Sequence, residues 1–543
     1  MLAQLPFDSF HVLVFVGILT VPYLGLFLIQ YTRYELRIRS LGVRAPVLAQ
    51  NPLTGLQWFV GAARAQLNHR LFDYFDDMFG RARGAATGDD CVEVQVMPAG
   101  GPRYIITRDP EHVKAVLAGQ FAHFGKGREF HELWSPFLGD SIFTTDGPLW
   151  HDSRSMIRPM FVKDRVSDLV VFERWSAALV RQIELQRRGL VGAGEEKYGS
   201  GGGDGDGVVD IQSLFYRMTL DITTDFLLGA AVDSLSNPRD EFAEAFNEVQ
   251  RLQMYLTTLG PFKDVVPRHR YRAGIRAIDR FVMPYIEAAL ALPAAELEKR
   301  TSASSSDFTF LHSVARYTRD PKVLRDQIVA VLLAGRDTTA ATLSWAFYEL
   351  SRYPAKVARL RAEILRSVGA APATPTYDNL KNMPYLRHVL NETLRLYPAV
   401  PYNLRVALAD TTIPSRDGQG PPIAVLRDDV VVYSTLSMQR RRNLYPKSSD
   451  GGHFADPAVF EPERWEKWTP KPWTYVPFNG GPRICVGQNF ALTEMAYVVV
   501  RLLQKYDKIE YVGDWNAQFH EPEIVGKPGQ GVKIRLHEAA TAT

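Results

Sequence analysis

The longest helical pattern in the chain begins at Asp320 and Pro321 and continues to Tyr353. Aspartate is a favoured N-cap, proline is favoured at the first helical position, and Pro354 cannot continue the helix. A helix over this range would hold about 33 residues and measure about 50 Å. Because an average helix has about 11 to 12 residues, the pattern predicts one unusually long helix.

The rest of the chain also reads as mostly helical, with a few short β-like segments. A second helix is expected over residues 384–396 and should end before Pro398. Segments rich in β-branched residues occur at 92–97, 103–107 and 430–433, and they indicate a small sheet. The predicted fold class is therefore mainly α with a small β region.

Residues 11–30, HVLVFVGILTVPYLGLFLIQ, contain no Asp, Glu, Lys or Arg. About 20 helical residues span about 30 Å, the thickness of a bilayer core. A cleaved signal peptide is the alternative, but no basic segment precedes the run and no small-residue cleavage site follows it. Arg33, Arg37 and Arg39 follow instead, which by the positive-inside rule places the rest of the chain in the cytosol. We predict a single transmembrane helix within residues 1–32.

The remaining composition is that of an ordinary globular protein. A net charge of +3 and the absence of a basic stripe argue against nucleic-acid binding. Two cysteines in 543 residues indicate no dependence on disulfides and fit a reducing compartment. We divide the chain into an anchor at 1–32, a linker at 33–60 and a main domain at 61–543, with a Gly-rich surface insertion at 192–207.

One cysteine lies in an unusual loop, FNGGPRICVGQNF, which begins at Phe478. Its glycines allow close approaches that a Cβ would forbid, and donors around the sulfur would stabilise a thiolate. A catalytic cysteine needs a nearby histidine and a zinc site needs a second ligand two to four residues away, and the loop has neither. A buried, unreactive cysteine is one interpretation. A lone thiolate also suits a metal that already has four ligands, which is heme iron.

The spacing F-x-x-G-x-R-x-C-x-G, which contains Phe478, Arg483 and Cys485, resembles the heme-binding signature of the cytochrome P450 superfamily. The resemblance extends over about residues 61–533. It implies a cytochrome P450 fold after the transmembrane helix, heme b as the cofactor and Cys485 as the axial ligand of the iron. Phe478 and Arg483 are implied as further heme-binding residues.

Other positions match the family's heme-propionate ligands. Trp150 and Arg154 resemble the helix segment whose Trp and Arg bind propionates, and Arg405 and Arg483 match two further positions. Guanidinium groups suit paired carboxylate recognition. Each arginine alone would be a solvated charge, but the set in register with the cysteine favours heme binding.

Glu392 and Arg395 are three residues apart and therefore share a helix face. In isolation this would be a surface ion pair worth at most about 1 kcal/mol. The resemblance implies instead a buried group completed by Arg464, which holds the fold behind the heme and takes no part in catalysis.

A run of poor helix formers, residues 334–339 (AGRDTT), lies midway along the long helix. Glycine costs up to about 1 kcal/mol relative to alanine in a helix, and Asp and Thr are weak helix formers. We expect a local opening of the helix that admits dioxygen and a water. By resemblance to the family's oxygen-activating segment, Thr338 would hold the proton relay and Asp337 would feed it.

Residues 139–161 and 482–494 resemble the fungal microsomal branch that oxidises alkanes and fatty acids. Met438-Gln439-Arg440 departs from it, since a histidine usually precedes the arginine. The resemblance implies insertion of one oxygen atom from O2 into a C–H bond of an apolar substrate, with terminal hydroxylation of long-chain fatty acids or alkanes. The alternatives are a hydroxylase of a fungal secondary metabolite or xenobiotic, a fatty-hydroperoxide isomerase or dehydratase, and a noncatalytic heme sensor.

The resemblance also implies partners and a location. Electrons would come from a separate NADPH-cytochrome P450 reductase, with cytochrome b5 as a second donor, because too few residues follow Cys485 for a flavin domain. Residues 440–442, three arginines, are a candidate docking patch for an acidic flavoprotein, with a solvated face as the alternative. We expect a single-pass protein of the endoplasmic reticulum membrane with its body in the cytosol.

The substrate pocket is expected to draw apolar side chains from two segments of the chain. Core packing accounts for about half of them equally well. The candidates are Phe130, Trp134, Phe137, Val400 and Tyr402.

Overall fold

The computed structural model describes residues 9–49, 51–79, 81, 90–95, 103–162, 168–190, 207–237, 240–259, 263–264, 266–301, 309–415, 420–446 and 456–539, with side chains omitted at 9–24 and 52. The chain forms two compact units. Unit 1 comprises Met1–Gly61, Asp77–Phe124 and Leu404–Tyr433, and unit 2 comprises Ala62–Asp76, Gly125–Asn403 and Ser434–Thr543.

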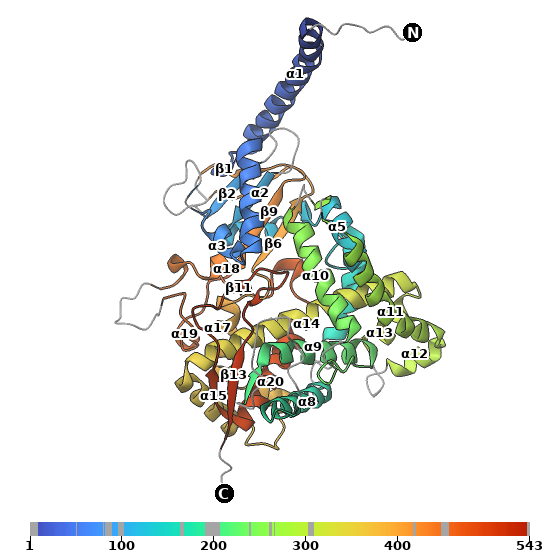
Figure 1. The fold of residues 1–543 in the computed structure, drawn as a ribbon, viewed down its shortest axis with the longest axis vertical. Coiled ribbons are helices and arrows are strands. Elements are labelled where there is room, and N and C mark those ends of the chain that lie inside the picture. The colour runs from blue at the N-terminus through green and yellow to red at the C-terminus, as the bar shows by residue number, and fades with distance from the viewer. Residues whose placement is uncertain are drawn as a thin grey trace. The chain divides into compact units, whose positions relative to one another are not determined.

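Unit 1 is built on a sheet with the strand order β1-β2-β3-β9-β6-β4, of which Figure 1 labels β1, β2, β9 and β6. Its four best-defined strands are β1 (Val47–Ala49), β2 (Cys91–Gln95), β3 (Arg103–Thr107) and β9 (Val430–Ser434). β2 pairs antiparallel with β3, whereas the pairs β1–β2 and β3–β9 are parallel. The predicted strands at 103–107 and 430–433 are confirmed. The prediction at 92–97 is confirmed as far as Gln95, and its last two residues lie outside the described chain.

Shorter elements complete unit 1. The sheet order ends with β6 (Tyr402–Ala407) and β4 (Phe124–Gly125), while β7 (Thr411–Ile413) and β8 (Ile423–Val425) form an antiparallel pair. The helix α4 (Pro110–Lys114) is capped by the side chain of Asp109. The core of this unit is made of β-branched and aromatic side chains because these residues pack well on a pleated surface; its buried members include Ile105, Val116, Phe124 and Val431.

The predicted membrane anchor overlaps α1 (Ser9–Leu41). Residues 1–8 lie outside the described chain, as do the side chains of residues 9–24. Among the residues that the structure describes, no helix combines the length and apolar character needed to cross a bilayer. The transmembrane helix is therefore not confirmed and stays a prediction.

The predicted linker, residues 33–60, contains regular structure. It holds the end of α1, β1 and the first part of α2 (Pro52–Leu67). Ile38 is 1% exposed and packs with Ala424 and Leu426, and Arg37 donates to Asp410 at 2.7 Å. These long-range contacts bind the segment to unit 1. The Gly-rich insertion, apart from Gly207, lies outside the described residues.

Unit 2 is mainly helical, which confirms the predicted fold class. Its longer helices are α5 (Arg128–Leu138), α6 (Gly147–Ile157), α8 (Val170–Arg187), α9 (Ile211–Leu228), α10 (Glu241–Leu259), α11 (His269–Ala291), α13 (Phe310–Tyr317), α14 (Pro321–Arg352), α15 (Pro354–Ser367), α17 (Pro384–Leu396) and α20 (Gln488–Lys505). Its short helices are α3 (Leu71–Asp76), α12 (Ala294–Arg300), α16 (Tyr377–Lys381), α18 (Thr435–Gln439) and α19 (Arg464–Lys467).

Two small sheets accompany these helices. β13 (Lys533–Glu538) pairs antiparallel with β10 (Tyr506–Tyr511) and with β5 (Val208–Asp210). A second antiparallel pair joins β11 (His520–Glu521) to β12 (Lys527–Pro528).

The long helix is confirmed as α14. The Asp320 side chain caps it by accepting from the Lys322 backbone N–H at 2.8 Å, and the helix ends at Arg352, before Pro354 starts α15. The helix packs against α9 and α20, which lie alongside it in Figure 1. A second prediction, the helix at 384–396, is confirmed as α17 with the same bounds.

The local opening expected at residues 334–339 is absent, because α14 is a continuous α-helix through this fully described stretch. Gly335 has a packing role that the sequence did not reveal. A Cβ at this position would stand 2.9 Å from the Thr223 hydroxyl oxygen on α9. Glycine therefore permits the close approach of the two helices.

Candidate active site

The loop that precedes α20 presents the sulfur of Cys485. The Cys485 backbone N–H donates to the Phe478 carbonyl at 2.9 Å, and Gly481 adopts a positive φ of 65°. A Cβ on Gly480 would stand 2.5 Å from the Trp473 ring, so this glycine is required by close packing. The resulting turn leaves Cys485 exposed, unlike the buried Cys91.

The electrostatic surroundings of Cys485 act in opposite directions. Burial of the sulfur raises the pKa of the Cys485 thiol, while the Gly487 backbone N–H and the Arg154 charge lower it. Burial has the larger effect on the thiol pKa, and the donor expected near the sulfur is present as the Gly487 backbone N–H. The Cys485 residue is solvent-accessible although its sulfur is densely surrounded, and a coordinated cation would displace the thiol proton.

Two arginines and a tryptophan gather beside this loop. Arg154 on α6 donates to the Ile484 carbonyl at 2.9 Å, and its guanidinium lies 5.9 Å from the centre of the Trp150 ring. Arg483 lies 4.7 Å from the same ring and donates to Asp146 at 2.6 Å. The structure therefore brings these three predicted residues together next to Cys485.

A further cation near this cluster was missed in the sequence. The Asp146 carboxylate, besides binding Arg483, accepts from the backbone N–H groups of Lys126 and Gly127, each at 2.8 Å. A Cβ on Gly125 would stand 2.5 Å from Asp146, so the glycine allows this approach. Lys126 is 8% exposed and is thus a buried cation beside the predicted propionate ligands. The sequence feature that could have identified Lys126 is its position between Gly125 and Gly127.

One short stretch in the middle of α14 is only partly covered by protein. From Asp326 to Ser351, every residue is buried except Ala334, Gly335 and Thr338. Positions i, i+1 and i+4 lie on one face of a helix. The Thr338 hydroxyl on this face donates to the Ala334 carbonyl at 2.7 Å. An otherwise buried helix therefore presents one small open face that carries the predicted relay hydroxyl.

The cysteine loop and this open face belong to helices that pack on each other. α20 starts three residues after Cys485 and contacts α14. At this contact the fully buried Glu494 lies next to Thr339, and the pKa of Glu494 is raised well above its usual value by burial. The accessible sulfur and the accessible helix face thus border the same pair of helices.

Asp337 differs from its neighbour Thr338 because it is buried. Its carboxylate lies 3.3 Å from the Arg336 guanidinium, and both side chains are nearly inaccessible. Burial raises the pKa of Asp337, while Arg336 and Lys527 lower it less strongly. The two predicted relay residues therefore stand on different sides of α14, one open and one enclosed.

The predicted ion triad is present and fully buried. Glu392 accepts from Arg395 at 2.7 and 2.8 Å and from Arg464 at 3.3 Å, and none of the three side chains has accessible surface. Gln439, at the position where the sequence departs from the family pattern, donates to the Arg395 carbonyl at 3.1 Å and accepts from the Val476 N–H at 2.9 Å. Gln439, the residue that departs from the family pattern, thus links the backbone of the triad helix to the backbone near Val476.

Two further sequence predictions concern Arg405 and the arginines at residues 440–442. Arg405 belongs to unit 1, where it is buried 5.8 Å from the Tyr433 ring, so its propionate role stays a prediction. The patch expected at residues 440–442 is corrected: Arg440 turns inward, donates to the Leu396 carbonyl and packs 5.3 Å from the Tyr397 ring. Only Arg442, 80% exposed, has a surface position suited to docking, and it already pairs with Asp456.

The predicted substrate-pocket residues have mixed surroundings. Phe137 is fully buried against Phe246, at 5.7 Å between ring centres, and so packs in the core. Phe130 stacks on Trp134 at 5.3 Å. Tyr402 packs against Phe72 and Phe75, and Val400 is 37% exposed. Their role in binding substrate stays a prediction.

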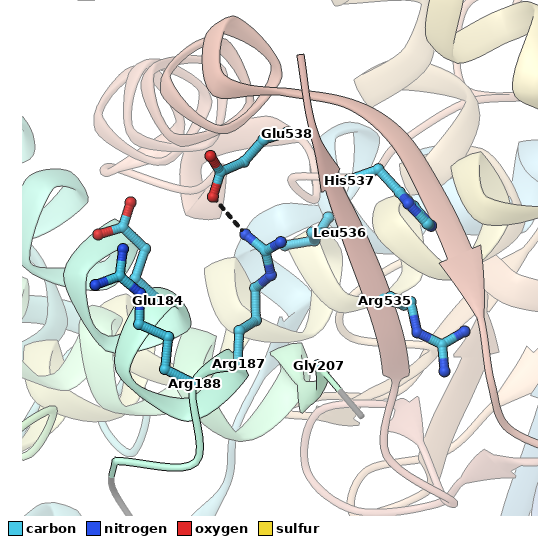
Figure 2. A pocket seen from close by; sticks show the side chains of 8 residues that line it. All are labelled: Glu184, Arg187, Arg188, Gly207, Arg535, Leu536, His537 and Glu538. Carbon is cyan, nitrogen blue, oxygen red and sulfur yellow. Dashed lines mark hydrogen bonds and ion pairs between the residues drawn. The ribbon is translucent and has the colours of Figure 1, made fainter. Parts of the chain in front are cut away.

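A hollow of about 350 Å³ lies elsewhere, between the end of α8 and β13 (Figure 2). Arg187 donates to Glu538 at 2.7 Å across it, and Arg535 and His537 both contact Glu510. Two of its three arginines, Arg187 and Arg535, are thus already paired with carboxylates. It lies on different elements from those that carry Cys485 and Thr338.

The site combines three features. They are one accessible cysteine before a helix, a group of cations beside it, and a partly open face on a long, mostly buried helix. This combination is typical of a protein that holds a prosthetic group through a thiol. The cytochrome P450 family model matches residues 94–531, and the chain belongs to this family of heme b-dependent oxidoreductases. The resemblance stated from the cysteine loop is thereby confirmed, together with the cofactor and the monooxygenase class.

Curated relatives match most of the chain. It is 45% identical to the cytochrome P450 monooxygenase pvhE of Talaromyces variabilis over 515 residues, 93% of this chain and 92% of the relative. It is 42% identical to cytochrome P450 52A1 of Candida tropicalis over 427 residues, 75% and 73% of the two chains. It is 36% identical to cytochrome P450 52A12 of Debaryomyces hansenii over 516 residues, 91% and 92% of the two chains.

The described residues fit heme b. The group needs one axial ligand, cations for two propionates and an open space beside the ligand. Cys485 offers an accessible sulfur, Arg154, Arg483 and Lys126 place cations near it, and α14 leaves one face uncovered.

Proposed function

We propose that this protein is a membrane-anchored monooxygenase that hydroxylates long-chain fatty acids or alkanes at the terminal carbon. The observation that carries the proposal is the single open face of α14, at Ala334, Gly335 and Thr338, on a helix packed against the one that follows Cys485. The choice of substrate is supported by similarity to the fungal relatives and by the apolar segment around Phe130 and Trp134.

In this proposal the residues of the site divide the work of holding the cofactor. Cys485 would bind the iron, and Phe478, whose carbonyl accepts from the Cys485 N–H, would hold the cysteine loop in shape. Trp150, Arg154, Arg483 and Arg405 would hold the propionates through charge-assisted hydrogen bonds. Heme b, when bound, supplies the redox chemistry that activates dioxygen. Glu392, Arg395 and Arg464 would keep the surrounding backbone in place.

Proton movement would depend on Asp337 and Thr338. The Thr338 hydroxyl lies on the open face, where it can donate a proton and be resupplied in turn. Burial raises the pKa of the enclosed Asp337, so its carboxyl keeps a proton to higher pH than an ordinary aspartate does, which suits a donor behind the hydroxyl. Electrons would come from a separate NADPH-cytochrome P450 reductase or cytochrome b5, at the endoplasmic reticulum membrane.

Replacement of Thr338 by alanine is expected to leave heme content unchanged but to divert most reducing equivalents into hydrogen peroxide. The hydroxyl is the only polar side-chain group on the open face of α14 and has no replacement in the described residues. The measurement is the ratio of product and of peroxide to NADPH consumed in the reconstituted system. General acid catalysis contributes about 10²-fold or more, so product yield should fall at least tenfold.

Thr342→Ala is the matched control. Thr342 lies one turn further along α14 and makes the same kind of bond, donating to the Thr338 carbonyl at 2.8 Å, but it is buried. Its variant should stay coupled. Unchanged coupling in Thr338→Ala, or equal uncoupling in both variants, would rule out the relay role of Thr338.

The substrate class is tested by product analysis. The reconstituted enzyme is incubated with fatty acids and alkanes of increasing chain length, and with compact polycyclic and aromatic compounds, and the products are identified by mass spectrometry. Terminal alcohols from the long chains are expected. Turnover of a compact substrate alone would contradict the proposal and would favour a hydroxylase of a secondary metabolite or xenobiotic.

A further inference from the structure

Asp337 shares its enclosed side of α14 with several polar groups from other elements. Arg336 lies 3.3 Å away on the same helix, Gln250 on α10 is a hydrogen-bonding neighbour, and Tyr216 on α9 lies 5.5 Å from Arg336. Asp337 Oδ1, Arg336 Nε and Arg336 Nη1 are buried without a hydrogen-bond partner among the described residues. Buried polar atoms of this kind are normally satisfied by an ordered water.

An ion pair from the β11–β12 hairpin reaches the same place. Lys527 Nζ lies 2.8 Å from Glu523 and 3.5 Å from Glu521. It also lies 5.9 Å from the Tyr216 ring, the ring on which Arg336 packs. Arg336 and Lys527 thus share one aromatic ring, and β12 packs against α14. At this contact the Lys527 charge lowers the pKa of Asp337 and the Glu523 charge raises it.

The hairpin also connects this enclosed cluster to solvent. Glu521 lies 3.7 Å from the His69 imidazole, which is 45% exposed. Glu523 itself is 32% exposed. A series of ionisable groups thus runs from the surface, through the hairpin, to the neighbourhood of Asp337.

We propose that the Lys527–Glu523 ion pair controls the protonation of Asp337. The proposal rests on the proposed function in one respect, because it gives Asp337 a proton to pass to Thr338. Lys527 and Glu523 are positioning residues, since they act through Asp337 and do not contact the substrate.

The direction of each effect follows from the charges. Arg336, Lys527, Glu523 and Tyr216 are the ionisable groups that face Asp337 from α14, the hairpin and α9, and Gln250 from α10 is neutral. Removing the Lys527 cation leaves burial and Glu523 less opposed, so the pKa of Asp337 should rise. Removing the Glu523 carboxylate leaves Lys527 uncompensated, so the pKa of Asp337 should fall. A merely structural role would not produce shifts of opposite sign.

The test uses the full-length holoenzyme and the infrared band of the protonated Asp337 carboxyl, identified by its loss in Asp337→Asn. The band is titrated with pH in Lys527→Met and Glu523→Gln. We expect the midpoint to move upward in the first variant and downward in the second, by about one pH unit each. Lys527→Arg keeps the charge and should keep the midpoint, which separates the electrostatic effect from misfolding.

Lys114→Met and Glu111→Gln are matched controls, because they form an exposed Lys–Glu pair at 3.1 Å far along the chain. Neither should move the midpoint. Shifts of the same sign in Lys527→Met and Glu523→Gln, or no shift beyond the controls, would overturn the proposal.

A second measurement separates this proposal from the proposed function. Asp337 holds its proton below its pKa, so coupling of NADPH use to product should be lost as pH rises through that value. Lys527→Met should therefore stay coupled to higher pH, and Glu523→Gln should uncouple at lower pH. If the infrared midpoints shift as expected while Asp337→Asn stays fully coupled, the ion-pair control holds and the relay role of Asp337 fails.

Discussion

Replacement of Cys485 by histidine is expected to abolish completely the strongly red-shifted absorption band of the reduced, carbon-monoxide-bound protein. That band would depend on a thiolate ligand to the heme iron, because the sulfur donates electron density that an imidazole does not. Cys485 is the one accessible cysteine of the described chain and lies in a glycine-framed turn directly before α20. Heme content, measured separately, shows whether the variant still holds the cofactor.

Cys91→Ser is the control for this experiment. Cys91 is 6% exposed on β2, where it packs with Ile105 and Phe124 in the core of unit 1. The variant should keep the band at full intensity for each bound heme. Loss of the band in Cys91→Ser, with retention in Cys485→His, would show that the assignment of the iron ligand is wrong.

Replacement of Glu392 by glutamine is expected to lower the free energy of unfolding by about 3–5 kcal/mol, because it leaves the buried charges of Arg395 and Arg464 without their carboxylate. Glu392 accepts from both arginines and from the Trp465 indole N–H at 3.0 Å, with no accessible surface on its side chain. Chemical denaturation of the detergent-solubilised protein, followed by circular dichroism, measures this change.

Glu466→Gln is the matched control for the buried triad. Glu466 pairs with Arg359 at 2.5 Å, but both side chains are substantially exposed. A surface pair contributes about 0–1 kcal/mol, so this variant should unfold almost like the wild type. Equal stability losses in the two variants would show that burial of the triad does not determine its contribution.

The sequence predicted those features that depend on neighbouring residues. The bounds of α14 follow from Asp320, Pro321 and Pro354, whose effects act within one helical turn. The turn around Cys485 likewise follows from glycines within five residues of the sulfur. The roles of Trp150, Arg154 and Arg464 came only through resemblance to a family, because nothing local distinguishes them from ordinary surface residues.

Only the tertiary structure decided the features that arise where distant segments meet. Gly335 had been interpreted as part of a helix opening, but the close approach of Thr223 on α9 explains it. Arg440 had been placed on a docking surface, but the Leu396 carbonyl and the Tyr397 ring draw it inward. In both cases the partner lies at least 40 residues away, so no local pattern could identify it.

The enclosed surroundings of Asp337 show the same limit at the centre of the proposed chemistry. The motif at residues 334–339 identified Asp337 and Thr338 as a pair, but the sequence did not predict which groups surround them. Burial of the carboxylate and the position of Lys527, which follows it by 190 positions, exist only once the hairpin packs against α9 and α14. The sequence determines which residue is the acid. Its proton affinity depends on the neighbouring charges and on the exclusion of solvent, and both of these arise only on folding.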